Sequence, residues 1–301
     1  MARLLFFALI WVSSWSSAQV TIPAETLAGR VLFLGDSITF SGDHLFNLQL
    51  LLKARHPKLG SEFLNLGLPS ETVSGLSEKG HADGRFPRPH LAERLDRVLE
   101  ATKPDLIIAA YGINCAIYQP FSEERFAAYQ KGFQDLQARS KKESVPIIFL
   151  TPWPYDAQKG PEAIPADYDQ VLARYRDWLL AQRANHWSVI DVHQPLKKEL
   201  AELRKSQSEA AFTRDGIHFN SAGSWQATRV LASAFDLTGP SFPANEDAFV
   251  QKLIQKGVLA SKADHQAQKN AFFTKRDEWL RRTGHLRPRT PGGPDDPKAT
   301  R

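Results

Sequence analysis

The sequence predicts an α/β protein in which a mostly parallel, five-stranded sheet lies between helices. Five short apolar runs do not alternate with polar residues, which is typical of strands that are covered on both faces. These runs are residues 31–35, 62–67, 105–112, 145–152 and 187–192. Helical patterns separate most of the runs, and such alternation indicates parallel strands joined by right-handed crossovers. Ligands of such sheets bind beyond the carboxyl ends of the strands, so we expect the functional residues there.

The first residues, MARLLFFALIWVSSWSSAQV, have the features of a cleaved signal peptide over residues 1–18. Arg3 supplies a positive charge, residues 4–12 are apolar, and Ser16-Ser17-Ala18 forms a small-residue site with cleavage expected after Ala18. A membrane anchor is the alternative, but the apolar run is shorter than the roughly 20 residues that a spanning helix needs. We therefore expect a secreted or periplasmic chain whose mature form does not insert into a membrane.

Capping residues and apolar stripes predict helices between the strands. One runs from about residue 91 to 102 and stops before Pro104. Ser122 is a good N-cap for the next, and two glutamates follow it in the first turn. Pro165 opens a third. The apolar stripes of the last two helices are Phe126, Tyr129, Phe133 and Leu136, and Tyr168, Val171, Leu172, Tyr175, Trp178 and Leu179.

The character of the chain changes after residue 240. We expect one α/β domain over residues 19–240 and a helical extension over 241–285, which packs either on that domain or on a partner. Residues 286–301 are rich in Pro, Gly and charge, a composition that predicts a disordered tail.

Charge and cysteine content exclude several classes of function. The formal net charge is +5, but the excess lies partly at the C-terminus and the body mixes both signs, so we expect no nucleic-acid partner. Cys115 is the only cysteine, so an internal disulfide cannot form. CxxC and HExxH are absent, and the segment HADGRFPRPH (81–90) fits a polar loop better than a metal site. We expect neither a metal nor an organic cofactor.

The segment VLFLGDSITF (31–40) ends the first strand on a turn that displays Ser37. A helical pattern begins near residues 42–45, and a serine at a strand-to-helix turn has backbone N–H groups that favour an anion. Taken alone, Ser37 fits a helix cap or a turn at least as well as a nucleophile.

The segment TRDGIHFNSAGS (213–224) places Asp215 three residues before His218, followed by Asn220 or Ser221 as a helix cap. Side chains at this spacing in a helical turn share a face. The carboxylate could then bind one imidazole nitrogen and leave the other free as a base. A capping turn with an incidental histidine is the alternative.

Two further segments follow strands and could supply hydrogen-bond donors. Gly67 follows the second strand, where its backbone can approach a ligand closely, and Asn114 in YGINC (111–115) follows the third. With Ser37, His218 and Asp215, these residues would provide a nucleophile, an oriented base and up to three donors to an oxyanion.

In this order, GDSIT, Gly67, GIN (112–114) and DGIH, from about residue 31 to 235, resemble the SGNH (GDSL-type) hydrolase family. The resemblance implies a three-layer, flavodoxin-like α/β/α fold. It also implies that Ser37 is the nucleophile and, through its own N–H, the first oxyanion donor. Gly67 and Asn114 would be the other two donors.

The same resemblance makes His218 the general base and Asp215 its orienting partner. One position departs from the family, which usually has an aspartate where Cys115 stands. We expect a buried, packing role for Cys115 rather than a catalytic thiol, and a looser hold on the Asn114 loop.

The implied reaction is ester hydrolysis through an acyl-enzyme, on an acylated small molecule or an acetylated polysaccharide. Trp153 and Tyr155 follow the fourth strand and either stack on sugar rings or pack a Pro-rich loop. No long apolar lid is visible, which favours a carbohydrate O-acetylesterase. A lysophospholipase or thioesterase of the same fold, and a non-catalytic glycan-binding module, are the alternatives.

Overall fold

The computed structural model describes residues 21–240 and 242–283, and its sheet confirms the predicted fold class. Five parallel strands lie in the order β2-β1-β3-β4-β5, which is the flavodoxin-like order. They are β1 (Gly29–Gly35), β2 (Ser61–Asn65), β3 (Leu106–Ala110), β4 (Ile147–Leu150) and β5 (Ser188–Ile190). Every residue of β3 and β4 is buried, as the continuous apolar runs predict.

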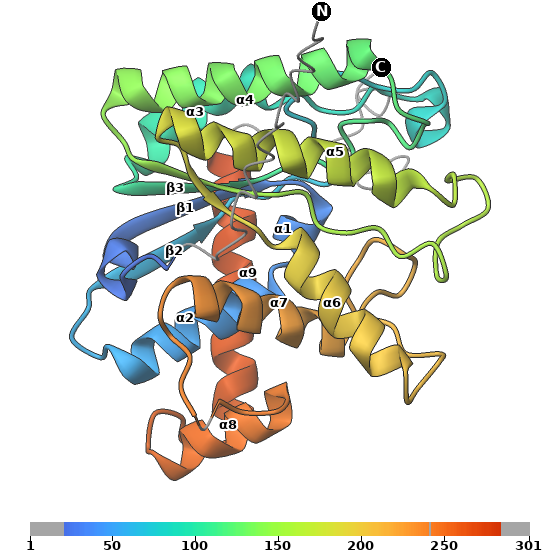
Figure 1. The fold of residues 1–301 in the computed structure, drawn as a ribbon. Helices are drawn as coiled ribbons and strands as arrows, with labels where there is room; N and C mark the ends of the chain where they lie inside the picture. The colour runs from blue at the N-terminus through green and yellow to red at the C-terminus, as the bar shows by residue number, and fades with distance from the viewer. Residues whose placement is uncertain (1–20, 241, 284–301) are drawn as a thin grey trace, which may run out of the picture.

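Helices cover both faces of the sheet (Figure 1). The helices α3, α4 and α5 lie on one face, and α2 and α7 lie on the other. The helices are α1 (Ser37–Ser41), α2 (Asp43–Arg55), α3 (Leu95–Thr102), α4 (Glu123–Glu143), α5 (Tyr168–Ala181), α6 (His193–Arg204), α7 (Ser221–Ala234), α8 (Glu246–Gln255) and α9 (Lys262–Arg282). Short 3-10 turns occupy Ala24–Leu27, His81–Gly84, Leu91–Glu93 and Gln182–Asn185.

Strand register brings the carboxyl ends of the central strands together. Gly35, the last residue of β1, pairs with Ala110, the last residue of β3. On the other side of β1, Phe33 pairs with Asn65 at the end of β2. The segments that follow these three strands therefore leave from one edge of the sheet, where β1 lies between strands that come later in the chain.

The helix after β1 is interrupted, unlike the single helix predicted from residues 42–45. α1 ends at Gly42, which has a left-handed φ of 67° and serves as the C-cap, and α2 starts with the next residue. Glycine adopts this conformation without the steric cost that other residues meet. The break lets a separate five-residue helix carry Ser37 at its first position.

The C-terminal helices pack on the α/β domain. α9 lies against α2 through Phe272 and Phe46, whose rings are 5.8 Å apart, and Lys275 of α9 bonds Glu62 of β2. Arg276 of α9 donates to the backbone oxygen of Phe40 at 2.8 Å, so this helix also holds the end of α1.

Two predicted segments, the signal peptide over 1–18 and the tail over 286–301, lie outside the described residues. Among the helices that the structure does describe, none combines the length and apolar character required to cross a membrane.

Candidate active site

Ser37 lies at the start of α1, directly beyond β1, and it is not the cap of that helix. The cap is Asp36, whose Oδ1 accepts the Ile38 N–H at 2.9 Å. The Ser37 side chain is therefore free for another partner, and its Oγ lies 2.8 Å from Nε2 of His218. This contact joins residues that are 181 positions apart in the sequence.

Asp215 and His218 share a tight turn that orients the imidazole. Oδ1 of Asp215 accepts the backbone N–H groups of Ile217 at 3.1 Å and His218 at 2.7 Å. Oδ2 lies 2.7 Å from Nδ1 of His218. Because a carboxylate only accepts, this contact assigns the proton to Nδ1 and leaves Nε2 free to accept the Ser37 hydroxyl. The turn needs Gly216, whose φ is +82°.

The backbone around this turn anchors it to the domain. Arg214 N–H donates to the His218 oxygen at 2.9 Å, and Thr213 forms a bridge with Phe219. Asn220, one of the two predicted caps, accepts the Gly223 N–H at 2.8 Å and so begins α7. The His218 side chain is 31% exposed and that of Asp215 is 50% exposed, so the pair faces solvent.

Two carboxyl groups near Ser37 titrate differently because their surroundings differ. Burial raises the pKa of Asp36 to about 7, against the opposing effects of the Ile38 N–H and the His218 charge. Burial also acts to raise the pKa of Asp215, but hydrogen bonds from the His218 side chain and backbone outweigh it and hold that pKa below its usual value. Asp215 thus stays ionised beside the imidazole.

Asn114 lies at the carboxyl end of β3 and is held by its amide oxygen. Oδ1 accepts hydrogen bonds from Nη1 of Arg88 at 3.0 Å and from the Tyr118 hydroxyl at 2.7 Å. Nδ2 makes only a long contact, 3.4 Å, with the backbone oxygen of Glu71. Since the amide nitrogen carries two hydrogens, the side chain keeps donor capacity for a ligand.

Gly67 does not present a free donor, contrary to the prediction. Its N–H donates to Oδ1 of Asn65 at 3.0 Å. Glycine is required at this position for packing, because a Cβ would collide with the backbone of Thr39 and Phe40 in α1. Gly67 therefore lets the segment after β2 pack closely against α1.

Ser70, which the sequence interpretation did not single out, presents a backbone N–H in the segment after β2. It has a left-handed φ of 65°, in a turn where the Glu71 N–H donates to the Leu68 oxygen at 3.1 Å. Leu68 itself donates to the Gly35 oxygen, and the Glu71 oxygen faces Asn114, so the turn lies between the ends of β1 and β3. Within the described ranges, the Ser70 N–H has no hydrogen-bond partner. Pro69, which favours the second position of a turn, was the available signal, whereas serine seldom adopts the positive φ seen at Ser70.

Cys115 is fully buried, as predicted, and burial raises the pKa of its thiol to about 12. A thiol that stays protonated is a poor nucleophile, which agrees with a packing role. The predicted loosening of the Asn114 loop is not what the structure shows. The loop is held because Arg88 and Tyr118 donate to the Asn114 side-chain oxygen. The Tyr168 hydroxyl also donates to the backbone oxygen of Ile113 at 2.7 Å.

Trp153 and Tyr155 do not offer the ring faces that sugar stacking would need. Trp153 is 2% exposed and packs edge-on against His44 and Phe219. Tyr155 is 5% exposed and lies against Tyr168. The predicted stacking role is therefore wrong, and the alternative, packing of the Pro-rich loop, is the one observed. The reason is that the loop folds back onto the domain and buries both rings.

No site for a metal ion was predicted. In the part of the chain that the structure describes, no group of three or more His, Cys, Asp or Glu side chains is arranged to hold one. In the segment 81–90, Nδ1 of His81 instead contacts Glu78 at 3.3 Å.

Comparison with solved structures supports the fold. A gut microbial diltiazem-metabolizing enzyme superposes with a TM-score of 0.56 at 18% identity, covering 73% of this chain and 50% of that one. The chain thus spans half the length of that enzyme. An α/β hydrolase from the metagenome of Lake Arreo, Spain, has a TM-score of 0.55 at 22% identity, with 72% and 100% coverage. An acetylxylan esterase from Geobacillus stearothermophilus has a TM-score of 0.51 at 22% identity, with 70% and 96% coverage.

Comparison of the sequence shows the family. Among curated proteins, none matches the chain. Residues 33–226, more than half of the chain, match the model of the GDSL-like lipase/acylhydrolase family. The chain belongs to this family and is a hydrolase of carboxylic esters, which confirms the predicted family and enzyme class.

Proposed function

We propose that Ser37, His218 and Asp215 are the catalytic triad of a serine esterase. The observation that carries this proposal is the unbroken series of hydrogen bonds from Ser37 Oγ to His218 Nε2, 2.8 Å, and from His218 Nδ1 to Asp215 Oδ2, 2.7 Å. His218 removes the hydroxyl proton as Oγ attacks the ester carbonyl. The alcohol leaves with that proton, and water then releases the acid from the acyl-enzyme by the same base.

Three donors are available for the oxyanion of the tetrahedral intermediate. They are the Ser37 N–H, the Asn114 amide and the Ser70 N–H, the last in place of the Gly67 N–H that the sequence predicts. All three follow neighbouring strands that end at one edge of the sheet. Donors fixed in advance stabilise the developing charge without the reorganisation that water would need.

The proposed substrate is an acetylated carbohydrate. The half-buried Ser37 and His218 and the exposed Asp215 suit an acetyl group that projects from a bulky polymer. The fold likeness to an acetylxylan esterase points the same way.

The decisive variant is Ser37→Ala. We expect it to lower kcat for p-nitrophenyl acetate by several orders of magnitude, as loss of a triad nucleophile does. Ser41→Ala, at the other end of α1, is the matched control and should retain activity. Esterase activity that survives in Ser37→Ala would refute the triad.

The substrate class is tested separately with the active enzyme. Acetate release from acetylated xylan, together with a fall in kcat/KM from acetate to octanoate and palmitate esters, would support the carbohydrate esterase. The reverse chain-length order would favour a lipolytic enzyme.

We also propose that the chain is exported, on the basis of residues 1–18. N-terminal sequencing of the protein produced in a secreting host should begin at Gln19. An intact Met1 would contradict this proposal.

A further inference from the structure

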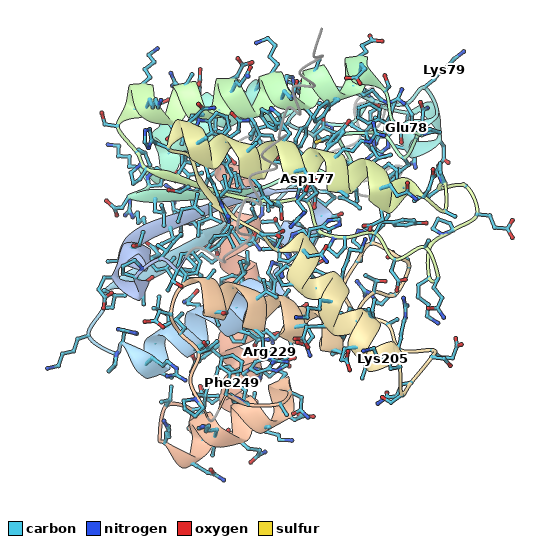
Figure 2. The ribbon with its side chains drawn as sticks, in the orientation of Figure 1. Glu78, Lys79, Asp177, Lys205, Arg229 and Phe249 are labelled. Carbon is cyan, nitrogen blue, oxygen red and sulfur yellow. The ribbon has the colours of Figure 1, made fainter. Side chains whose placement is uncertain are left out.

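The loop between β2 and α3 places the buried, positively charged side chain of Arg88 against the Asn114 amide. The Arg88 side chain is only 4% exposed, and its Nη1 donates to Oδ1 of Asn114 at 3.0 Å. Glu78, from the same loop, holds the rest of the guanidinium with two contacts of 2.6 Å, to Nε and Nη2. Figure 2 shows Glu78 beside Lys79 on this loop, with the Lys79 side chain extending away from the protein. Arg88 is therefore fixed in position and directed inward.

Tyr118 reaches the same oxygen from the other direction. Its hydroxyl donates to Asn114 Oδ1 at 2.7 Å, and its ring lies 4.9 Å below the Arg88 guanidinium. Tyr118 and its neighbour Ile117 both have left-handed backbones, with φ of 56° and 48°. Non-glycine residues are strained in this conformation, and it persists only where the surrounding structure imposes it. With the backbone in this conformation, the Tyr118 hydroxyl lies on the Asn114 oxygen.

These two donors determine which way the Asn114 amide faces. A carbonyl oxygen has two lone pairs, and Arg88 and Tyr118 use both. The amide can therefore not exchange its oxygen and nitrogen, and Nδ2 must face the opposite side, where it meets only the Glu71 oxygen at 3.4 Å. A cationic donor on the oxygen also polarises the amide and strengthens its N–H groups as donors.

We propose that Arg88 and Tyr118 are positioning residues for ester hydrolysis, which aim and polarise the Asn114 amide toward the oxyanion. This inference rests on the proposed function. In the described structure neither side chain makes a hydrogen bond to Ser37 or His218, and both donate to Asn114, so their effect passes through that residue. The Asn114 amide would stabilise a charge that appears only in the transition state. Loss of either positioning residue should therefore lower kcat and leave KM nearly unchanged.

Tyr118→Phe is the central variant because it removes one hydrogen bond and keeps the ring. We expect kcat to fall about tenfold with KM changed less than about twofold, within the roughly 10²–10³-fold loss expected for Asn114→Ala. Arg88→Met should lower kcat further than Tyr118→Phe, since it removes the charge as well as the bond. Thermal unfolding of each variant checks that it is folded.

Two matched controls come from the same regions. Tyr129→Phe removes a buried hydroxyl that has no hydrogen-bond partner among the described residues, so kcat should not change. Arg85→Met removes an exposed arginine of the same loop and should also leave kcat unchanged.

A double-mutant cycle decides whether the effect passes through Asn114. In an Asn114→Ala background, Tyr118→Phe should cause no further loss of kcat. A full additional loss there, or an unchanged kcat for Tyr118→Phe alone, would overturn the inference. Ser37→Ala, measured in parallel, separates this outcome from failure of the proposed function. If wild-type activity does not depend on Ser37, the triad itself is wrong.

Discussion

The reacting side of the site (Ser37, His218 and Asp215) and its donor side (Asn114 with Arg88 and Tyr118) are held by different means. On the reacting side, carboxylates bind groups two or three residues away, as in the Asp36–Ile38 and Asp215–His218 contacts. On the donor side, Arg88 reaches Asn114 across 26 residues of sequence. On the same side, Glu71 pairs with Arg94 across 23 residues of sequence.

The two sides also differ in burial, and the difference follows from their tasks. Asp215 and His218 face solvent, where a substrate must enter, and a short turn can orient them without a surrounding core. The donor side needs a fixed direction rather than access. Buried polar networks, in which every member has partners, provide such rigidity.

The largest expected effect comes from breaking the reacting side with Asp215→Asn. Asn keeps an oxygen for the two backbone N–H groups of the turn but presents an amide N–H to Nδ1 of His218. The imidazole must then carry its proton on Nε2, the wrong tautomer for a base. We expect kcat to fall about 10⁴-fold.

The control for this variant is its stability. The Asp215 side chain is half exposed, and Asn keeps the oxygen that binds the turn, so the free energy of unfolding should change by less than about 1 kcal/mol. An Asp215→Asn enzyme within tenfold of wild-type kcat would show that Asp215 does not orient His218.

Sequence reasoning could single out the residues of the reacting side because the contacts within each segment are local, although the Ser37–His218 contact spans 181 positions. Ser37 and the DGIH turn stand in short motifs, and the strands that position them are continuous apolar runs. Asp36 was missed as the cap of α1 because two adjacent residues, Asp and Ser, are both good caps.

The contacts of the donor side could not be predicted from the sequence because they join residues that are far apart in the chain. Nothing near YGINC indicates that an arginine from the segment 81–90 binds the Asn114 oxygen, or that Tyr118 adopts a left-handed backbone. Gly67 was assigned as a donor because a glycine after a strand also fits a close packing contact, which is what it makes with α1. Trp153 and Tyr155 were misassigned because the fold of their loop decides which faces are exposed.

The second prediction is a loss of stability in Glu71→Gln, which breaks the buried ion pair next to the donor side. Glu71 and Arg94 are both 0% exposed, and two contacts of 2.6 Å join them. The Tyr111 hydroxyl donates to the same carboxylate at 2.6 Å. The variant leaves a buried guanidinium without its counter-charge, so the free energy of unfolding in urea should fall by about 3–5 kcal/mol.

The exposed pair Lys131–Asp135 is the matched comparison, with side chains 73% and 64% exposed. Asp135→Asn should cost less than about 1 kcal/mol. Equal losses for the two variants would contradict the assignment of structural rigidity to the buried network.

The last prediction concerns Asp36, beside Ser37 on the reacting side, and depends on pH. Burial raises the pKa of Asp36 to about 7, from 3.8. Glu71 adds to this shift, while His218 and Arg88 oppose it. Between these two pH values the folded state holds a proton that the unfolded state releases. The free energy of unfolding should therefore fall as pH rises, by at most about 1.4 kcal/mol per pH unit, and level off above about pH 7.

Asp36→Asn isolates this contribution, because Asn is also a good cap and binds no proton in this range. The stability of the variant relative to wild type, from urea unfolding at several pH values, should rise from pH 4 to pH 7 and then stay constant. A difference that does not vary with pH would show that Asp36 is ionised in the folded protein. The hydrogen bond from Ile38 and the nearby cations would then outweigh burial, and the reacting side would contain a buried anion at the start of α1.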